Sequence, residues 1–301
     1  MTSFLITGEG YPFFKILKAV REMLGASIAG AVIGATTSTM AESFAVKAGS
    51  RIFSLAILTG KEPFPKEAQA DWLVNINGAT IITAEVVNRF PKRAINMHPG
   101  LLPQYAGLHC TQWAIRNGEA FQGITIHLMD EGVDTGDILA QKTIPILKTD
   151  TGLSLFMRTI ETGSSFLINI LKRIVEDDVP SAMKQDFSLR RLYRHKDALG
   201  DRVDWKWDSL QICNFVRAAN YEPLVCPTYT PVAEIVGKRF VLRTCVRMPN
   251  HLAAAAGTLL QLTEQGPVVA CGNQEAVLIT RAFYKGEFVI PSKWRELAAL
   301  T

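Results

Sequence analysis

The chain has 301 residues, of which 48% are hydrophobic and 20% charged, enough apolar material for two folded cores. The formal net charge of +4 is spread along the sequence and gives no electrostatic reason to expect binding to nucleic acid or a membrane surface. Five widely spaced cysteines without a CxxC pair predict neither a disulfide framework nor a metal site, and no stretch approaches the ~18 apolar residues of a membrane helix. We therefore expect a soluble protein of the reducing cytoplasm.

The first third of the chain alternates between strand-like and helix-like patterns. Strands are predicted at 3–8, 27–33, 72–76 and 94–98, and helices at 11–24, 40–48 and 84–89. Such alternation predicts an α/β fold, in which a Rossmann-like, mostly parallel sheet carries helices on both faces.

Further elements suggest where this first domain ends and a second begins. A helix is predicted at 111–117, strands at 123–129 and 138–146, and a long helix at 153–176 with Asp150 or Thr151 as its N-cap. Residues 184–203 have little periodicity and are predicted to be a linker between a catalytic domain at 1–183 and a second domain at 204–301. A helix from Asp208 to Ala219 and five short strands predict a small, OB-like β-barrel there.

The stretch Asn96-Met-His98 ends one of the predicted strands. Side chains alternate along a strand, so Asn96 and His98 share one face, and Pro99-Gly100 stops the pairing directly afterwards. The carboxyl ends of the strands in an open α/β sheet are where ligands bind. An amide and an imidazole are thus predicted to project together into a ligand site.

An acidic loop lies between two later strands. Residues 129–136 contain Asp130, Glu131 and Asp134 together with two glycines. A carboxylate beside His98 would orient its ring and raise its pKa, and Asp134 is our candidate for that carboxylate. Asp130 and Glu131 are interpreted as solvated or loop-shaping acceptors.

Plainer interpretations compete with these assignments. A histidine at a strand end is often structural, and asparagine is a common turn former. His127, in the middle of a strand, is predicted to be a packed core histidine, and the adjacent His109 and Cys110 have no supporting pattern for nucleophilic catalysis.

Several ordered motifs together resemble the folate-dependent formyltransferase family, which includes glycinamide ribonucleotide, methionyl-tRNA and sugar-amine N-formyltransferases. The motifs are Asn96-x-His98-x-x-Leu-Leu-Pro103, Gly107, Trp113-Ala-Ile, Gly118, Gly123-Ile-Thr, Met129-Asp-Glu-Gly and Asp134-Thr-Gly136. The stretch from Asp204-Trp205 through 216–223 is similar to the start of that family's C-terminal barrel domain.

The resemblance implies a donor, a reaction and a set of residues. It implies that 10-formyltetrahydrofolate gives its formyl group to an amine and that Asn96, His98 and Asp134 are catalytic, with no metal ion. It also implies a folate pocket on two loops and the motif between them, for which we predict Gly78, Thr80, Ile82, Leu101, Asp130, Glu131 and Val133.

The acceptor is predicted from departures from the family pattern. Transfer-RNA enzymes carry a Gly/Arg/Lys-rich insertion after the second strand, whereas residues 34–40 here are short and uncharged, which weakens binding to a polyanion. Gly100 replaces a usual serine, and Ala106 a common arginine. We expect a small-molecule amine, an aminosugar nucleotide or an amino-acid derivative, and leave open a carrier-bound acceptor and a homodimer. The alternatives are methionyl-tRNA formyltransferase, a formyltetrahydrofolate hydrolase and a non-catalytic folate-binding protein.

Overall fold

The computed structural model describes residues 1–33, 39–47, 49–78, 80–91, 93–197, 200–248 and 254–299. The chain forms two compact units, each made of separate stretches. The N-terminal unit contains Met1–Cys110, Gln122–Pro145 and Met157–Tyr193, and the C-terminal unit contains Thr111–Phe121, Ile146–Phe156 and Arg194–Thr301. Most of the uncharged loop at 34–40 lies outside the described residues.

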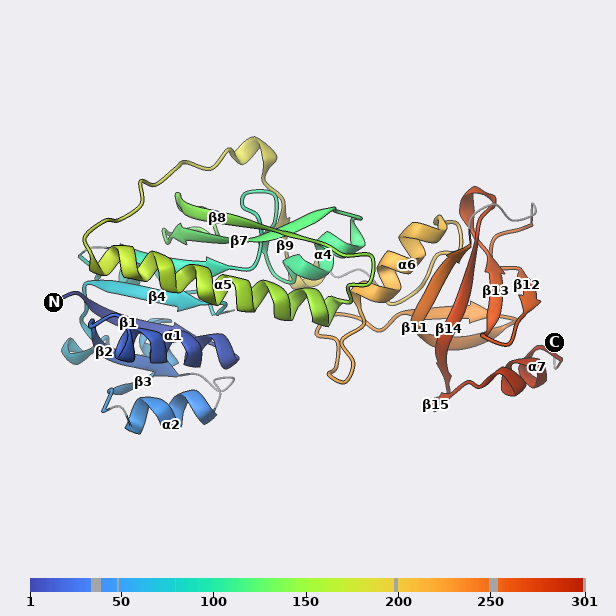
Figure 1. Ribbon diagram of the computed structural model, residues 1–301, viewed down its shortest axis with the longest axis horizontal. Coiled ribbons are helices and arrows are strands. Elements are labelled where there is room, and N and C mark those ends of the chain that lie inside the picture. Colours follow the sequence, from blue (N-terminus) through green and yellow to red (C-terminus); the bar gives the residue numbers. More distant parts are fainter. Residues whose placement is uncertain are drawn as a thin grey trace. The chain divides into compact units, whose positions relative to one another are not determined.

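A seven-stranded sheet forms the N-terminal unit, with the order β3-β2-β1-β4-β5-β7-β8 (Figure 1). Its strands are β1 (Ser3–Gly8), β2 (Ser27–Ile33), β3 (Ile52–Ser54), β4 (Trp72–Ile76), β5 (Arg93–His98), β7 (Phe121–Leu128) and β8 (Ile138–Pro145). The first five are parallel to one another, and β7 runs antiparallel to β5. The predicted mostly parallel sheet is confirmed, although the three-residue strand β3 was too short to be predicted.

Helices cover both faces of this sheet, as predicted. They are α1 (Gly10–Glu22), α2 (Thr39–Lys47), α3 (Ala84–Val87) and α5 (Gly152–Val175). On one face Leu73 packs with Val86 of α3, and on the other Gly163 of α5 lies close against Met97 and Ile124. Buried strands such as β1 and β4 are apolar almost throughout, and because successive side chains point to opposite faces, each strand serves both layers.

Thr151, rather than Asp150, caps the start of α5. Its Oγ1 accepts the Ser154 N–H at 3.1 Å, and the Ser154 hydroxyl accepts the Thr151 N–H at 2.9 Å. Asp150 instead accepts the N–H of Leu147 at 2.6 Å, in the turn before the helix. The sequence had left both residues open, because each carries an oxygen that suits an N-cap.

The C-terminal unit contains α4 (Cys110–Arg116), which begins at the last residue of the N-terminal unit, α6 (Ser209–Ala218) and a curled antiparallel sheet (Figure 1). The sheet contains β10 (Val232–Ile235), β11 (Lys238–Met248), β14 (Ala276–Tyr284), β13 (Pro267–Ala270) and β12 (Leu259–Leu262), in that order, with β15 (Glu287–Phe288) beside β14. Asp208 and Gln211 form a capping box at the start of α6, as expected from Asp208. The sheet is consistent with the predicted OB-like domain, whereas α7 (Pro291–Ala299) was not predicted.

Shorter elements complete the described chain. Strands β6 (Ala106–Gly107) and β9 (Leu192–Tyr193) form a small parallel pair, and single 3₁₀ turns lie at Leu55–Ile57, Lys66–Ala68, Phe187–Leu189, His195–Asp197 and Gly272–Gln274. Among the described residues, no helix has both the length and the apolar content that crossing a membrane takes.

Candidate active site

Three polar side chains form a row across neighbouring strands of the N-terminal unit. The strand register places Asn75 of β4 beside Asn96 of β5, and Asn96 beside His127 of β7. The Asn75 amide donates to Asn96 Oδ1 at 3.1 Å, and Asn96 Nδ2 lies 3.1 Å from His127 Nε2. All three side chains are buried, so each hydrogen bond satisfies a group that water does not reach.

The row fixes which way the Asn96 amide points. His127 Nδ1 lies 2.7 Å from the Leu128 carbonyl, which can only accept, so this nitrogen carries the proton and Nε2 accepts from Asn96. Asn96 Oδ1 is already paired with Asn75. The second N–H of Asn96 is therefore directed toward Asp134 Oδ1, which lies 3.5 Å from Asn96 Nδ2. Asn96 is therefore held as a hydrogen-bond donor.

The structure brings His98 and Asp134 together from two separate stretches of sequence. His98 Nδ1 lies 3.5 Å from Asp134 Oδ2, which also accepts the Gly107 N–H at 2.8 Å. His98 Nε2 lies 2.6 Å from the Tyr105 carbonyl and so carries the proton. The Nδ1 lone pair of the neutral ring then faces the carboxylate, and an N–H placed between the two atoms would find two acceptors.

Burial and charge set the protonation states of this pair. Burial lowers the pKa of His98 below its ordinary 6.5, although Asp134 and the Tyr105 carbonyl oppose the shift. Burial alone would raise the pKa of Asp134, but His98, His127 and the Gly107 N–H outweigh it and hold that pKa well below its ordinary 3.8. A neutral imidazole beside an ionised carboxylate is thus the state at neutral pH.

Little of the cluster is open to solvent. The His98 ring is 4% exposed, Asn96 9%, and the Asp134 side chain 11%. Gly100 contributes to this closure, because a Cβ at that position would overlap both the Tyr105 carbonyl and the His98 ring. The glycine that replaces the family's usual serine therefore lets the loop close over Nε2, and Asn96 and Asp134 are the less deeply buried members of the cluster.

Cys110 lies beside His98 rather than acting with its neighbour in sequence, His109. Its Sγ is 3.6 Å from His98 Nε2 and 3.2 Å from the Tyr105 carbonyl. Burial, followed by the negative charge of Asp134, raises the pKa of the Cys110 thiol well above its ordinary value. The thiol stays protonated, which does not suit a nucleophile.

The predicted folate-pocket residues lie on the loops after β4, β5 and β7. Gly78 packs against the Asn75 side chain, where a Cβ would overlap its amide oxygen, and Ile82 is buried in the core with α3. Asp130 shapes its loop by accepting from the Gly132 N–H at 3.0 Å and the Thr135 hydroxyl at 2.6 Å. The remaining members are the half-buried Thr80 and Leu101 and the exposed Glu131 and Val133. Their contact with folate stays a prediction.

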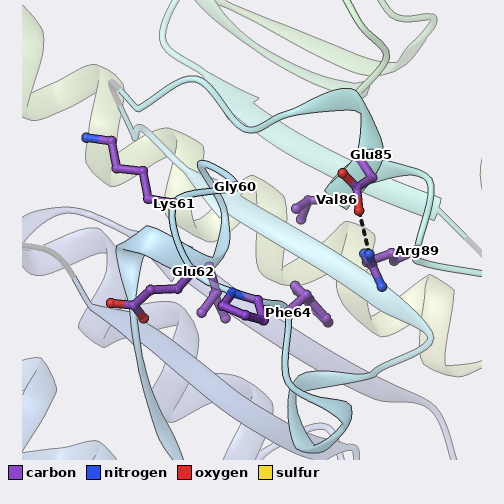
Figure 2. A pocket seen from close by; sticks show the side chains of 9 residues that line it. Gly60, Lys61, Glu62, Phe64, Glu85, Val86 and Arg89 are labelled. Atoms are coloured by element: carbon purple, nitrogen blue, oxygen red, sulfur yellow. Dashed lines mark hydrogen bonds and ion pairs between the residues drawn. The ribbon is translucent and has the colours of Figure 1, made fainter.

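A half-open hollow of about 390 Å³ lies elsewhere on the N-terminal unit (Figure 2). It lies between the segment 57–64 and helix α3, and among the described residues its walls include none of the predicted site residues. Its Arg89 already pairs with Glu85 and lies over the Phe64 ring, with 5.5 Å from the guanidinium carbon to the ring centroid. We assign it no part in the chemistry.

Sequence reasoning missed two members of the cluster. His127 was interpreted as a core histidine, and it is buried, but its ring lies 3.5 Å from Asp134 Oδ1 and accepts from Asn96. Asn75 was not considered, although it is the one polar residue of the strand Trp72–Ile76. A single amide or imidazole in an otherwise apolar strand would have been the signal, because burial demands a partner for it.

Comparisons with known proteins show what this chain is similar to. Residues 64–171 match the model of the formyl transferase family, and 200–290 match that of its C-terminal domain. GDP-perosamine N-formyltransferase of Brucella melitensis is 33% identical over 153 residues, covering 51% of this chain and 58% of that protein. Methionyl-tRNA formyltransferase of Anaeromyxobacter dehalogenans is 31% identical over 219 residues, covering 72% and 68%.

A solved structure shows the same fold over nearly the whole chain. The N-formyltransferase from Helicobacter canadensis, solved with folinic acid and dTDP-3-aminofucose, has a TM-score of 0.69 at 17% identity and covers 94% of this chain and 100% of that one. The Brucella match spans little more than half of that relative, so it does not carry the whole protein's activity over. Matches to both family models and the identity over two thirds of the Anaeromyxobacter enzyme show that this chain belongs to the formyl transferase family.

Proposed function

We propose that this protein transfers the formyl group of 10-formyltetrahydrofolate to the primary amine of a small molecule. The observation that carries the proposal is the convergence of Asn96, His98 and Asp134 at the carboxyl end of β5, in a chain of the formyl transferase family. The proposal includes the catalytic domain at 1–183, the linker at 184–203 and the barrel-like domain at 204–301, and a cytoplasmic location.

Each of the three residues has a task in the proposed reaction. The amine nitrogen bonds to the formyl carbon, and the Asn96 N–H that faces Asp134 Oδ1 at 3.5 Å turns to donate to the oxyanion of the tetrahedral intermediate, a stabilisation of ~3–4 kcal/mol for one well-placed donor. His98 Nδ1 takes the proton that the amine loses and passes it to the folate nitrogen as the bond between the formyl carbon and that nitrogen breaks. Asp134, 3.5 Å away, stabilises the imidazolium.

The burial of His98 determines how the substrates enter. Both ring nitrogens face groups of the chain, the Tyr105 carbonyl and Asp134. We place the amine at the edge formed by Asn96 and Asp134, where its N–H can lie between His98 Nδ1 and the carboxylate. We expect the predicted folate residues Gly78 and 130–133 to border this edge, because Gly78 packs on Asn75 and the second loop leads into Asp134.

An aminosugar nucleotide is the acceptor class that we favour. Its support is the similarity to GDP-perosamine N-formyltransferase and the fold shared with an enzyme solved with dTDP-3-aminofucose. Amino-acid derivatives and carrier-bound amines belong to the same chemistry. Methionyl-tRNA formyltransferase is the second candidate, favoured by the longer match to the Anaeromyxobacter enzyme. The uncharged residues 34–40 speak against it, because they offer no cations to a tRNA acceptor stem.

A panel assay tests the proposal. The purified chain is mixed with 10-formyltetrahydrofolate and aminosugar nucleotides, amino acids or charged initiator tRNA, and the formylated product and the free tetrahydrofolate are quantified. We expect product with an aminosugar nucleotide; salt-sensitive formylation of the tRNA alone would favour the second candidate. Formate released without any amine would indicate a hydrolase. A raised melting temperature with the donor but no turnover would indicate a folate-binding protein.

A further inference from the structure

Residues 183–193, which we name the strap, lie along both loops that build the active site. Met183 exchanges two backbone hydrogen bonds with Ile138, of 2.7 and 2.8 Å, directly after the acidic loop. At the other end, β9 pairs with β6, and the Tyr193 ring stacks on Tyr105 at 5.3 Å between centroids. The strap thus contacts the loop that carries Asp134 and the loop whose carbonyl holds His98.

Gln185 is the residue of the strap whose buried side chain bonds to the acidic loop. It is 8% exposed, and its Nε2 donates to the backbone carbonyls of Asp134 at 3.0 Å and Gly136 at 2.7 Å. Arg190 adds a third bond, from its guanidinium to the Val133 carbonyl at 2.6 Å. Three carbonyls around one catalytic candidate are therefore held by a segment far away in sequence.

Asp134 needs such support. Its backbone has a φ of 53°, in the left-handed region, which strains a non-glycine residue and persists only where neighbours enforce it. In this conformation Oδ2 accepts from Gly107 and faces His98, while Oδ1 faces Asn96 and His127. A relaxed backbone at Asp134 would turn the carboxylate away from all four groups.

We propose that Gln185 is a positioning residue, which acts through Asp134 by fixing the strained backbone that aims its carboxylate at His98. The inference rests on the proposed function for its effect on turnover. Gln185 touches no reacting atom. Without its amide, Asp134 samples other conformations, and formyl transfer falls about ten- to a hundredfold, the size expected when a catalytic group is misplaced by about 1 Å.

The test compares two identical substitutions at neighbouring positions. Gln185→Met keeps the side-chain length but removes both donors, whereas Lys184→Met changes a side chain that is 89% exposed and pairs with Asp137 at the surface. We expect kcat to fall in Gln185→Met with little change in KM, and to stay at the wild-type value in Lys184→Met. Equal activity of the two variants would overturn the proposal.

Two further measurements separate positioning from a general loss of structure. In an Asp134→Asn background, Gln185→Met should reduce transfer by less than threefold, because both substitutions act on the same carboxylate. A full additional loss would contradict the proposal. NMR titration of the His98 ring, assigned with His98→Asn, should show a lower pKa in Gln185→Met than in the wild type, because the negative charge of Asp134 raises it. An unchanged titration overturns the inference.

The role of Gln185 can still be tested if the wild-type chain is inactive or if Gln185→Met does not fold. If the wild-type chain transfers no formyl group, the proposed function fails, but the His98 titration still decides whether Gln185 places Asp134. If Gln185→Met does not fold, as judged by its thermal transition, Gln185→Asn takes its place, since the shorter amide cannot reach both carbonyls. Wild-type titration in a folded Gln185→Asn would then refute the assignment.

Discussion

The two units bury polar groups in different ways. In the N-terminal unit, Asn75, Asn96 and His127 bond to one another, and the row continues to Asp134 and His98. In the C-terminal unit, the core is built from residues such as Ile212, Phe215, Phe240, Val277 and Trp294. Its buried polar side chains form smaller groups, as where Gln112 donates to the Ala218 carbonyl at 3.2 Å and accepts from the Thr228 hydroxyl at 3.1 Å.

The difference separates residues that hold the fold from residues that do chemistry. A connected network of buried amides, imidazoles and a carboxylate costs more to assemble than an apolar core of the same volume. Such a network therefore marks the site, whereas the apolar core of the C-terminal unit reports on packing alone. Substitutions in the first region should change turnover, and those in the second should change stability.

The largest expected effect comes from His98→Ala. Loss of the proton acceptor should reduce formyl transfer by at least about a hundredfold, while folding and folate binding persist. Turnover, the melting temperature and the shift of that temperature with the donor measure the three quantities. Near-normal turnover in a folded variant would refute the catalytic assignment.

Trp294→Ala should give the opposite profile. Its ring is 4% exposed and lies 4.4 Å from the Phe240 ring, so truncation leaves a cavity and should lower the free energy of unfolding by about 3–5 kcal/mol. Turnover per folded molecule should stay unchanged below the new transition. A large loss of kcat without a loss of stability would show that the contrast between the units does not hold.

Asn75→Ala tests the member of the row that the sequence did not reveal. It leaves Asn96 Oδ1 without its donor, so the amide is no longer held with Nδ2 toward the site, and transfer should fall roughly tenfold. Asn88→Ala, at the exposed C-cap of α3, is the control. Equal rates for the two variants would make Asn75 a structural residue only.

The smallest expected effect is on the pH dependence of stability and rate. Because burial lowers the pKa of folded His98 below 6.5, the unfolded chain binds more protons between that lowered pKa and about 6.5, so stability falls as the pH is lowered through this window. The low pKa of Asp134 adds stability that is present above about 3.8 and is lost below it. The same neutral ring should keep formyl transfer active to pH values below 6.5.

Denaturant unfolding at several pH values, compared with that of His98→Asn, measures this slope. The variant should lose the part of the slope between the lowered pKa and about 6.5. A stability that rises on acidification through this window would mean that His98 is charged in the folded chain, and the base would have to be sought elsewhere.

The sequence determined the fold class and the candidate triad through local patterns. Strand and helix periods predicted the parallel sheet, and the alternation of side chains placed Asn96 and His98 on one face. The acidic loop supplied Asp134 as a candidate, the family resemblance implied its catalytic role, and the structure then brought the three together. These inferences depend only on residues that lie close together in the sequence, or on the motifs of a known family.

Tertiary structure decided which residues surround the triad. Asn75 and His127 join it only through the register of β4, β5 and β7, and Gln185 only because residues 183–193 return to the acidic loop. The register is set by packing across the whole sheet, since a shift of one residue would move Asn75 or His127 to the other face. The path of residues 183–193 back to the acidic loop is likewise set by tertiary packing. A period of two tells which face a side chain takes, but not which neighbour it meets there.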